Sequence, residues 1–320
     1  MRIVFCGTPE FAVPSLRHLL TQRGFDILAV LTQPDRPRGR GQEVAEPAVK
    51  EAALAADIPV YQPEKVRAPE VQQRLEKLQP DAVVIIAYGQ IIPARLLAIP
   101  RHGWINLHAS LLPKYRGAAP INWAIANGET KTGITSMRID AGMDTGEMLL
   151  RRETEIAPDE TAPELAGRLA EMGAPLLVET LRGLAAGSIQ PQAQDAAGAT
   201  YAPILKKEDG RIDWKRPAQE IYNRMRAFVP WPGAYTTFRG QLCHDWGHLW
   251  GEAVSNTERE KVAAGPPGTL AHASGELLVA CGDTTVLRVT SVKREGRKET
   301  NASEFANGMR LTVGERFGEG

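Results

Sequence analysis

Short, continuously apolar runs alternate with helix-forming segments through the first 130 residues of the 320-residue chain. The apolar runs, which favour buried strands, are residues 2–6, 27–32, 82–87 and 104–108. Between and after them, residues 11–20, 47–56, 69–78 and 119–126 have the composition and periodicity of helices. Strands that are apolar on both faces need cover on both sides. This pattern predicts an α/β domain in which helices flank a parallel sheet.

In such sheets, ligands bind beyond the carboxyl ends of the strands. Gly7, the Tyr88–Gly89 pair, Asn106 and His108 all follow or end predicted strands, which indicates one shared crevice. Neither Gly-x-Gly-x-x-Gly nor Gly-x-x-x-x-Gly-Lys-Ser/Thr occurs at these turns. We therefore expect the sheet to serve neither NAD nor ATP.

The pattern changes from residue 134 onward. Residues 134–139 and 147–153 read as strands and 163–185 as a long helix, whereas 187–200 is polar and without periodicity. Beyond residue 204 the helix signal is confined to 217–228, and the other runs are short and β-like. We expect a first domain at 1–188, a linker at 189–204 and a small β-barrel domain at 205–320.

Asn106, His108 and Asp144 are the strongest candidates for chemistry. Residues i and i+2 of a strand point to the same face, so Asn106 and His108 should emerge side by side. An amide donor beside an imidazole suits a reaction in which a carbonyl oxygen gains charge while a nitrogen changes its protonation state. Asp144, in a turn-rich stretch, would orient the imidazole or favour its cation. A purely structural Asn-x-His pair is the alternative.

The net charge is zero, from 38 basic and 38 acidic residues, so a polyanionic partner would have to meet local patches. Arg36, Arg38 and Arg40 lie in such a patch, within a Pro- and Gly-rich stretch at 34–41 that we expect to be an irregular loop. Spaced arginines suit phosphate contacts, and a solvated surface loop is the alternative.

The remaining features bear on the cellular compartment, on metal binding and on the oligomeric state. No apolar run approaches the roughly 20 residues that span a bilayer, and no signal peptide is evident. Three widely spaced cysteines, Cys6, Cys243 and Cys281, favour a reducing cytoplasm. The cluster at 243–248 fits no zinc template, so no metal is expected. Without a coiled coil or swapped segment, we expect a monomer.

Residues 108–120, HASLLPKYRGAAP, closely resemble the signature of the folate-dependent formyltransferases, and 140–146, DAGMDTG, resemble its second signature. Residues 33–41 and 228–233 are similar to the branch that acts on charged tRNA. The resemblance implies a Rossmann-like formyltransferase domain followed by an OB-like domain that helps to hold tRNA.

The same resemblance implies a reaction. The formyl group of 10-formyltetrahydrofolate, the co-substrate, would pass to the α-amino group of methionyl initiator tRNA, for translation initiation. Asn106, His108 and Asp144 match the catalytic residues. The folate-binding positions implied are Ser110, Leu111, Leu112, Pro113, Ile86, Tyr88, Gly89 and Ile91.

The implied tRNA contacts are Arg36, Arg38 and Arg40, with Arg40 matching the family's most important arginine, together with Lys206 and Lys207. After Gly41 this chain has Gln42 and Glu43, where the family often carries lysines. The expected tRNA contacts of this loop therefore depend mainly on the three arginines. The alternatives are a formyltransferase acting on a sugar-nucleotide amine or a purine precursor, and a catalytically silent tRNA-binding module.

Overall fold

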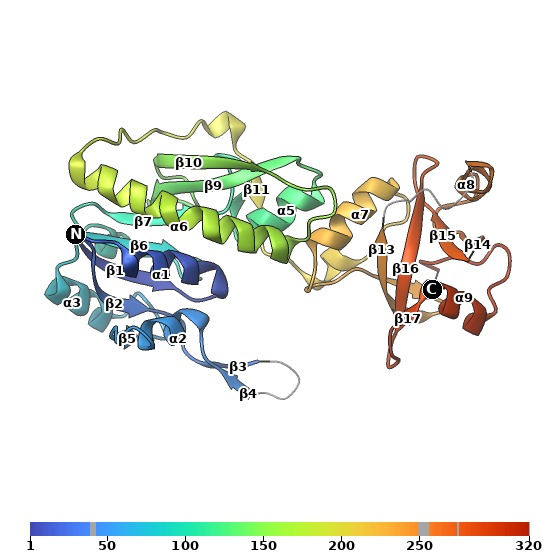
Figure 1. Cartoon of the computed structure of the whole chain (residues 1–320), viewed down its shortest axis with the longest axis horizontal. Helices are drawn as coiled ribbons and strands as arrows, with labels where there is room; N and C mark the ends of the chain where they lie inside the picture. Colours follow the sequence, from blue (N-terminus) through green and yellow to red (C-terminus); the bar gives the residue numbers. More distant parts are fainter. Residues whose placement is uncertain (39–42, 249–255, 274, 320) are drawn as a thin grey trace. The chain divides into compact units, whose positions relative to one another are not determined.

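The computed structural model describes residues 1–38, 43–248, 256–273 and 275–319 (Figure 1). These residues form two compact units. The first contains Met1–Pro120, Lys131–Glu155 and Glu164–Pro203, and the second contains Ile121–Thr130, Ile156–Pro163 and Ile204–Gly320. No helix among the described residues is long and apolar enough to cross a membrane.

A seven-stranded sheet forms the centre of the first unit, in the order β10-β9-β7-β6-β1-β2-β5. Five strands are parallel: β1 (Arg2–Gly7), β2 (Asp26–Leu31), β5 (Val60–Tyr61), β6 (Ala82–Ile86) and β7 (Trp104–His108). At one edge, β9 (Lys131–Arg138) pairs antiparallel with β7, and β10 (Met148–Glu155) pairs antiparallel with β9. The predicted α/β class with a parallel sheet is confirmed.

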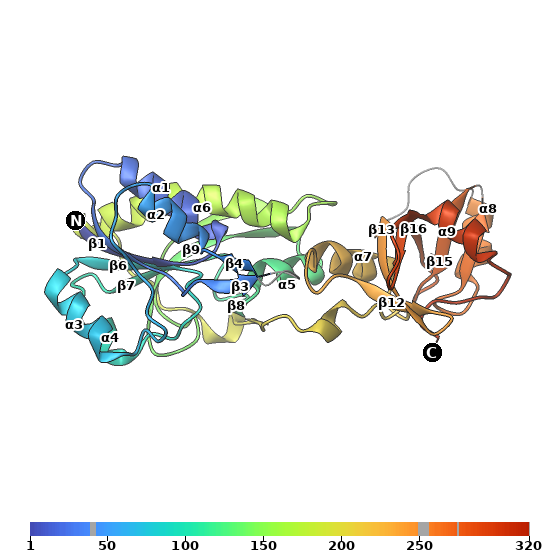
Figure 2. The same cartoon turned by 90° about the horizontal axis from the view of Figure 1, so that it is seen from below.

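Helices cover both faces of this sheet, as Figure 2 shows. One face packs against α1 (Val13–Thr21), which follows the short η1 (Glu10–Ala12), and against α2 (Ala48–Leu54) and α6 (Ala162–Ala186). The other face packs against α3 (Pro69–Leu78) and α4 (Ala94–Leu97). Ile3 and Phe5 of β1 enter the first core and Val4 and Cys6 enter the second. This alternation explains why buried parallel strands are apolar throughout.

Two segments of the first unit differ from the pattern that we expected. Within 34–41, residues 36–38 are not irregular: β3 (Arg36–Arg38) pairs antiparallel with β4 (Glu43–Ala45). Pro37 is tolerated because a two-stranded ribbon leaves one side of each strand without a ladder partner. Residues 189–203, expected as a connection, contact the first unit: Met148 and Gln192 exchange two backbone hydrogen bonds, and β11 (Tyr201–Ala202) pairs with β8 (Arg116–Gly117). A short η2 (Ala196–Gly198) lies between them.

The second unit is built on a curled antiparallel sheet, a half-barrel, in the order β12-β13-β16-β15-β14 with β17 beside β16. Its strands are β12 (Tyr235–Phe238), β13 (Gln241–His248), β14 (Leu270–Ala273), β15 (Glu276–Ala280), β16 (Val286–Arg294) and β17 (Thr300–Asn301). Near the C-terminus, Arg316 bridges to Thr269 and Phe317 to Phe238. Phe317 is buried and stacks on Trp214 in the main core of this unit.

The helices of the second unit are α5 (Pro120–Ala126), α7 (Ala218–Ala227), α8 (Asn256–Ala263), α9 (Ala302–Met309) and the short η3 (Lys207–Gly210). The expectation that helix would be confined to 217–228 is wrong for α8 and α9. Helix α9 contains Gly308 and Asn307, which weaken its sequence signal. It forms because the Asn301 side chain caps Glu304 N and because Phe305 packs into the core.

Candidate active site

Strand β7 carries Asn106 and His108 to the end of the first sheet. It lies between β6, where Ile85 pairs with Asn106, and β9, where Thr135 pairs with His108. Asn106 is half-buried, and among the described residues none forms a hydrogen bond with its side chain. Because a buried or half-buried amide normally finds a partner, this side chain is available to a ligand.

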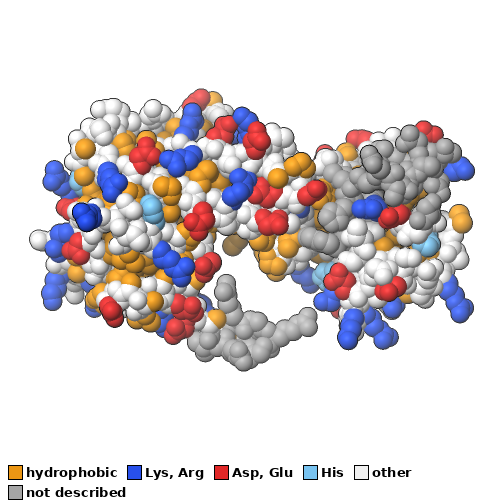
Figure 3. Space-filling model, in the orientation of Figure 1, with side chains coloured by type: hydrophobic (Ala, Val, Ile, Leu, Met, Phe, Trp, Pro, Cys, Tyr) orange, Lys and Arg blue, Asp and Glu red, His pale blue; other side chains and the backbone are white. Residues whose placement is uncertain are grey.

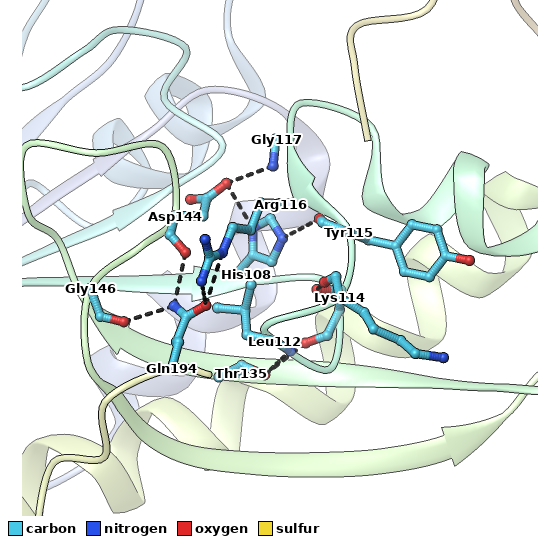
Figure 4. Close-up of polar contacts among 11 residues, drawn as sticks. His108, Leu112, Lys114, Tyr115, Arg116, Gly117, Thr135, Asp144, Gly146 and Gln194 are labelled. Carbon is cyan, nitrogen blue, oxygen red and sulfur yellow. Dashed lines mark hydrogen bonds and ion pairs between the residues drawn. The ribbon is translucent and has the colours of Figure 1, made fainter. Parts of the chain in front are cut away.

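His108 is held by two neighbours (Figure 4). Its side chain is 6% exposed, and Nε2 lies 2.9 Å from the carbonyl oxygen of Tyr115. A carbonyl only accepts, so Nε2 carries the proton of that hydrogen bond. Nδ1 lies 3.7 Å from Oδ2 of Asp144, a distance within ion-pair range but too long for a good hydrogen bond. Nδ1 therefore remains free to serve another group.

Asp144 comes from the turn between β9 and β10 and has a left-handed backbone, with φ +53°. Its Oδ2 accepts a hydrogen bond of 2.8 Å from the backbone N–H of Gly117. Among the described residues none donates to Oδ1. The structure thus brings Asp144 to His108 across 36 positions of the sequence, with one carboxylate oxygen held and the other open.

Gln194 is a residue of this site that our reading of the sequence missed. Its side chain joins the segment after α6 to Arg116 and to the turn that carries Asp144 (Figure 4). No local signal marks it, because it lies in a polar stretch, 187–200, that we read as a connection. Only the pairing of β11 with β8 would have indicated its place.

The residues expected to bind folate fall into two groups. Ile86, Tyr88, Ser110 and Leu112 are buried, so any contact from them would involve mainly backbone atoms. Leu111 and Pro113 are half-buried, whereas Gly89 is exposed and Ile91 is 91% exposed. The turn at 110–113 is held by Thr135, whose hydroxyl donates to Ser110 O and accepts from Leu112 N.

A cavity of about 1240 Å³ opens beyond the carboxyl ends of β1, β2 and β6. Its lining includes Thr8, Gln33, Glu64, Tyr88, Gly89 and Ile91. Gln33 and Thr8 both donate to the carbonyl of Tyr88, which fixes the turn where Gly89 has φ +82°. Asn106, His108 and Asp144 do not line this cavity, but β6, which leads into Tyr88, is paired with β7.

The expected basic contacts are exposed where their side chains are described. Arg36 lies in β3 and faces Glu64 at 3.7 Å, both side chains being largely exposed. Such a pair contributes little stability, so Arg36 can exchange it for a phosphate. Arg38 ends β3, and Arg40 and Gln42 lie outside the described residues. Lys206 and Lys207 of the second unit are exposed.

Further Lys and Arg side chains gather on the second unit near the turn between β16 and β17 (Figure 3). Lys293, Arg297 and Lys298 are exposed there, and Arg294 is partly exposed. Within the described part of the chain, no group of three or more His, Cys, Asp or Glu residues could hold a metal ion.

Known protein families and individual known proteins match this chain over most of its length. Residues 1–181 match the family Formyl transferase, and residues 204–310 match Formyl transferase, C-terminal domain. The chain is 56% identical over 320 residues to the methionyl-tRNA formyltransferase of Solibacter usitatus, covering 100% of this chain and 99% of the relative. It is 53% identical to that of Acidobacterium capsulatum, covering 99% of this chain and 100% of the relative.

Two solved structures share the fold at lower identity. A sugar 3N-formyl transferase, WlaRD, crystallised with dTDP and 5-N-formyl-THF, has a TM-score of 0.63 at 18% identity and covers 93% of this chain and 99% of its own. HypX from Aquifex aeolicus in complex with tetrahydrofolic acid has a TM-score of 0.61 at 17% identity, covering 98% of this chain and 48% of its own.

Proposed function

The chain belongs to the methionyl-tRNA formyltransferases, and on this basis we propose how its residues perform the reaction. It is a folate-dependent enzyme that transfers a formyl group from 10-formyltetrahydrofolate to the α-amino group of methionyl initiator tRNA. A sugar-nucleotide amine is not favoured as acceptor, because the sugar formyltransferases are only 18% identical. The observation that supports the catalytic roles below is the 3.7 Å approach of His108 Nδ1 to Asp144 Oδ2.

In the first step the neutral amine of methionine attacks the formyl carbon. A C–N bond forms and the formyl oxygen takes the negative charge. The Asn106 amide, which has no hydrogen-bond partner in the part of the chain that the structure describes, donates to that oxygen. His108, in its cationic form, adds a second donor. Because Nε2 is bound to Tyr115 O and Nδ1 is too far from Asp144 for a good hydrogen bond, Nδ1–H is the group that reaches the oxyanion.

In the second step the bond between the formyl carbon and N10 of the folate breaks. The attacking nitrogen must lose a proton and N10 must gain one. Asp144 Oδ1 has no donor among the described residues, so it can accept the proton from the amine. The proton then passes to N10, directly or through one water. The residues described here thus supply the charge stabilisation and the proton transfer.

The folate would lie along the Tyr88–Gly89 turn and residues 110–113, where backbone groups rather than buried side chains would bind the pterin. The methionyl end of the tRNA would enter from the large cavity beyond β1, β2 and β6. Arg36, Arg38 and Arg40 would bind phosphates of the acceptor stem, and Lys206 and Lys207 would add contacts from the second unit.

We also infer that the protein works as a monomer in the cytoplasm, where charged tRNA and reduced folate are made. Cys6, Cys243 and Cys281 are buried thiols, in keeping with a reducing compartment. Light scattering during size-exclusion chromatography should give one chain of 34.9 kDa, and a stable dimer would contradict the monomer.

The central test of the roles is formyl transfer from labelled 10-formyltetrahydrofolate to charged initiator tRNA by wild type and Asn106→Ala. Loss of one oxyanion donor should lower kcat by about 10²–10³-fold. Asn307→Ala, an exposed amide in α9, is the matched control and should retain wild-type turnover. Near-normal turnover by Asn106→Ala would show that Asn106 does not stabilise the oxyanion.

A further inference from the structure

The side-chain amide of Gln194 uses its full hydrogen-bonding capacity. Nε2 donates to the carbonyl oxygens of Asp144 at 2.8 Å and of Gly146 at 2.7 Å. Oε1 accepts from Nε and Nη2 of Arg116 at 3.0 and 2.7 Å. A primary amide has two N–H donors and two lone pairs, so every one is used. Turning the amide over would place donor against donor and acceptor against acceptor, so this orientation is the only satisfied one.

On one side, Gln194 binds Arg116, whose two neighbours in the sequence hold His108 and Asp144 through backbone groups. Arg116 is 5% exposed and follows Tyr115, whose carbonyl accepts from His108 Nε2. It precedes Gly117, whose N–H donates to Asp144 Oδ2. A second bond fastens the same two segments, because Arg116 N donates to Thr200 O at 2.8 Å.

On the other side, Gln194 holds the turn that presents the Asp144 carboxylate. The left-handed φ of Asp144 is an uncommon conformation for a residue other than glycine and persists only where its surroundings impose it. Gly146 packs closely against Arg138, since a Cβ there would lie 1.9 Å from the carbonyl oxygen of Arg138, so only glycine fits at this position. The two carbonyls bound by Gln194 thus belong to the two residues that define the turn.

We propose that Gln194 is a positioning residue that sets the separation of His108 and Asp144 by binding Arg116 and the Asp144 turn with one amide. The proposal rests on the catalytic roles proposed above for His108 and Asp144. Gln194 itself need not contact a substrate. A displacement of about 1 Å at a reacting group can cost about 10²-fold in rate, so this position should matter to turnover.

The change Gln194→Glu tests the amide with almost no change of shape. A carboxylate can still accept both bonds from Arg116, and the ion pair should keep the segment in place. Its other oxygen, however, would face the carbonyls of Asp144 and Gly146 without a proton to share. Gln194→Met, which removes all four bonds without adding charge, is the second variant. Gln192→Glu is the matched control, because Gln192 lies two residues away with an exposed side chain.

The experiment measures kcat, both KM values and the melting temperature of these variants, alone and combined with Asp144→Asn. We expect kcat to fall about 10²-fold in Gln194→Glu and in Gln194→Met, with unchanged KM for folate and tRNA. Gln192→Glu should behave as wild type. In the Asp144→Asn background neither Gln194 change should cause a further loss, because the residue it positions no longer functions.

Several results would overturn the proposal: wild-type kcat in both Gln194 variants, an equal loss in Gln192→Glu, or a full additional loss in the Asp144→Asn background. A loss that appears only as a lower melting temperature, with kcat per folded molecule unchanged, would also overturn it. If Asp144→Asn alone kept its turnover, the catalytic role of Asp144 would fail first, whatever the Gln194 variants did.

Discussion

In the first unit, His108 is almost fully buried and Asp144 has one carboxylate oxygen held by a backbone donor, whereas in the second unit Lys206 and Lys207 are exposed. Buried groups with fixed partners can be aligned to within a fraction of an ångström, as bond making requires. Exposed cations can adapt to a phosphate backbone but cannot align a reaction. On the roles proposed above, buried groups of the first unit carry out the chemistry, and exposed cations of both units, such as Arg36 and Lys206, bind the tRNA backbone.

This division predicts different kinetic consequences. Changes among the aligned groups should lower kcat, because they act in the transition state. Changes among exposed cations should raise KM for tRNA and alter its salt dependence while leaving folate binding unchanged. The predictions below test that separation, beginning with the largest expected effect.

Replacing His108 by Gln retains polar atoms but removes the cation and the proton-transfer group. We expect kcat to fall by about 10²–10⁴-fold at unchanged KM for tRNA. His18→Gln, on α1 of the same unit and away from the sheet end, should have wild-type kinetics. An effect of His108→Gln confined to KM would break the comparison, because the buried site would then be a binding element.

Replacing Arg40 by Ala removes one expected phosphate contact. We expect a higher KM for tRNA, and a plot of log binding constant against log salt concentration whose slope is shallower by about 1. The affinity for folate should not change. Arg23→Ala, an exposed arginine of the first unit, is the control. A parallel loss of folate binding would contradict the assignment of Arg40 to tRNA.

The double change Lys206→Ala and Lys207→Ala should produce a smaller rise in KM for tRNA, since the second unit offers further cations between β16 and β17. Steady-state kinetics at low and high salt would measure it, because the difference from wild type should shrink as salt screens the contacts. Lys261→Ala, exposed on α8, is the matched control. A fall in kcat with unchanged KM would indicate that the second unit takes part in the chemistry.

Burial raises the pKa of the Cys281 thiol in the second unit to about 12, and burial also raises the pKa of Cys6 in the first. The raised pKa means that the neutral thiol is favoured in the folded state. The Cys281 thiol should therefore leave the free energy of unfolding of the second unit unchanged below its ordinary pKa near 9. That free energy should decrease as the pH rises toward 12.

Thiol labelling followed by mass spectrometry of the peptides checks this prediction. At pH 8 neither Cys6 nor Cys281 should react in the native protein, and each should react when its own unit unfolds in denaturant. Rapid labelling of Cys281 in the native state would show that the core of the second unit is open. Different denaturant midpoints for the labelling of Cys6 and Cys281 would show that the two units differ in stability.

Some of the fold could be predicted because its signals are local. The strands that become β1, β6 and β7 are apolar runs of about the right length, and the turns after them mark the sheet end where Asn106 and His108 lie. The family resemblance, which the comparisons confirm, linked Asp144 to the same site across the sequence. Periodicity alone contains no such long-range information.

The features that were missed depend on contacts between distant residues. Strand β13 carries Gln241, His244 and Asp245, so it has no apolar alternation, and it forms because β12 and β16 pair with it on both sides. Gln194 looks like any polar residue of a connection until β11 pairs with β8 and places it against Arg116. Its four hydrogen bonds join it to three residues, Arg116, Asp144 and Gly146, all more than 40 positions away in the sequence.

The most direct measurement is single-turnover formyl transfer by Asp144→Asn with both substrates saturating, beside folate binding measured by equilibrium titration. Asp57→Asn is the control, because Asp57 is exposed in the same unit and has a similar left-handed backbone, with φ +55°. We expect Asp144→Asn to bind folate as the wild type does and to transfer formyl groups at least about 10²-fold more slowly. Transfer at the wild-type rate would contradict the catalytic pair that His108 and Asp144 are proposed to form.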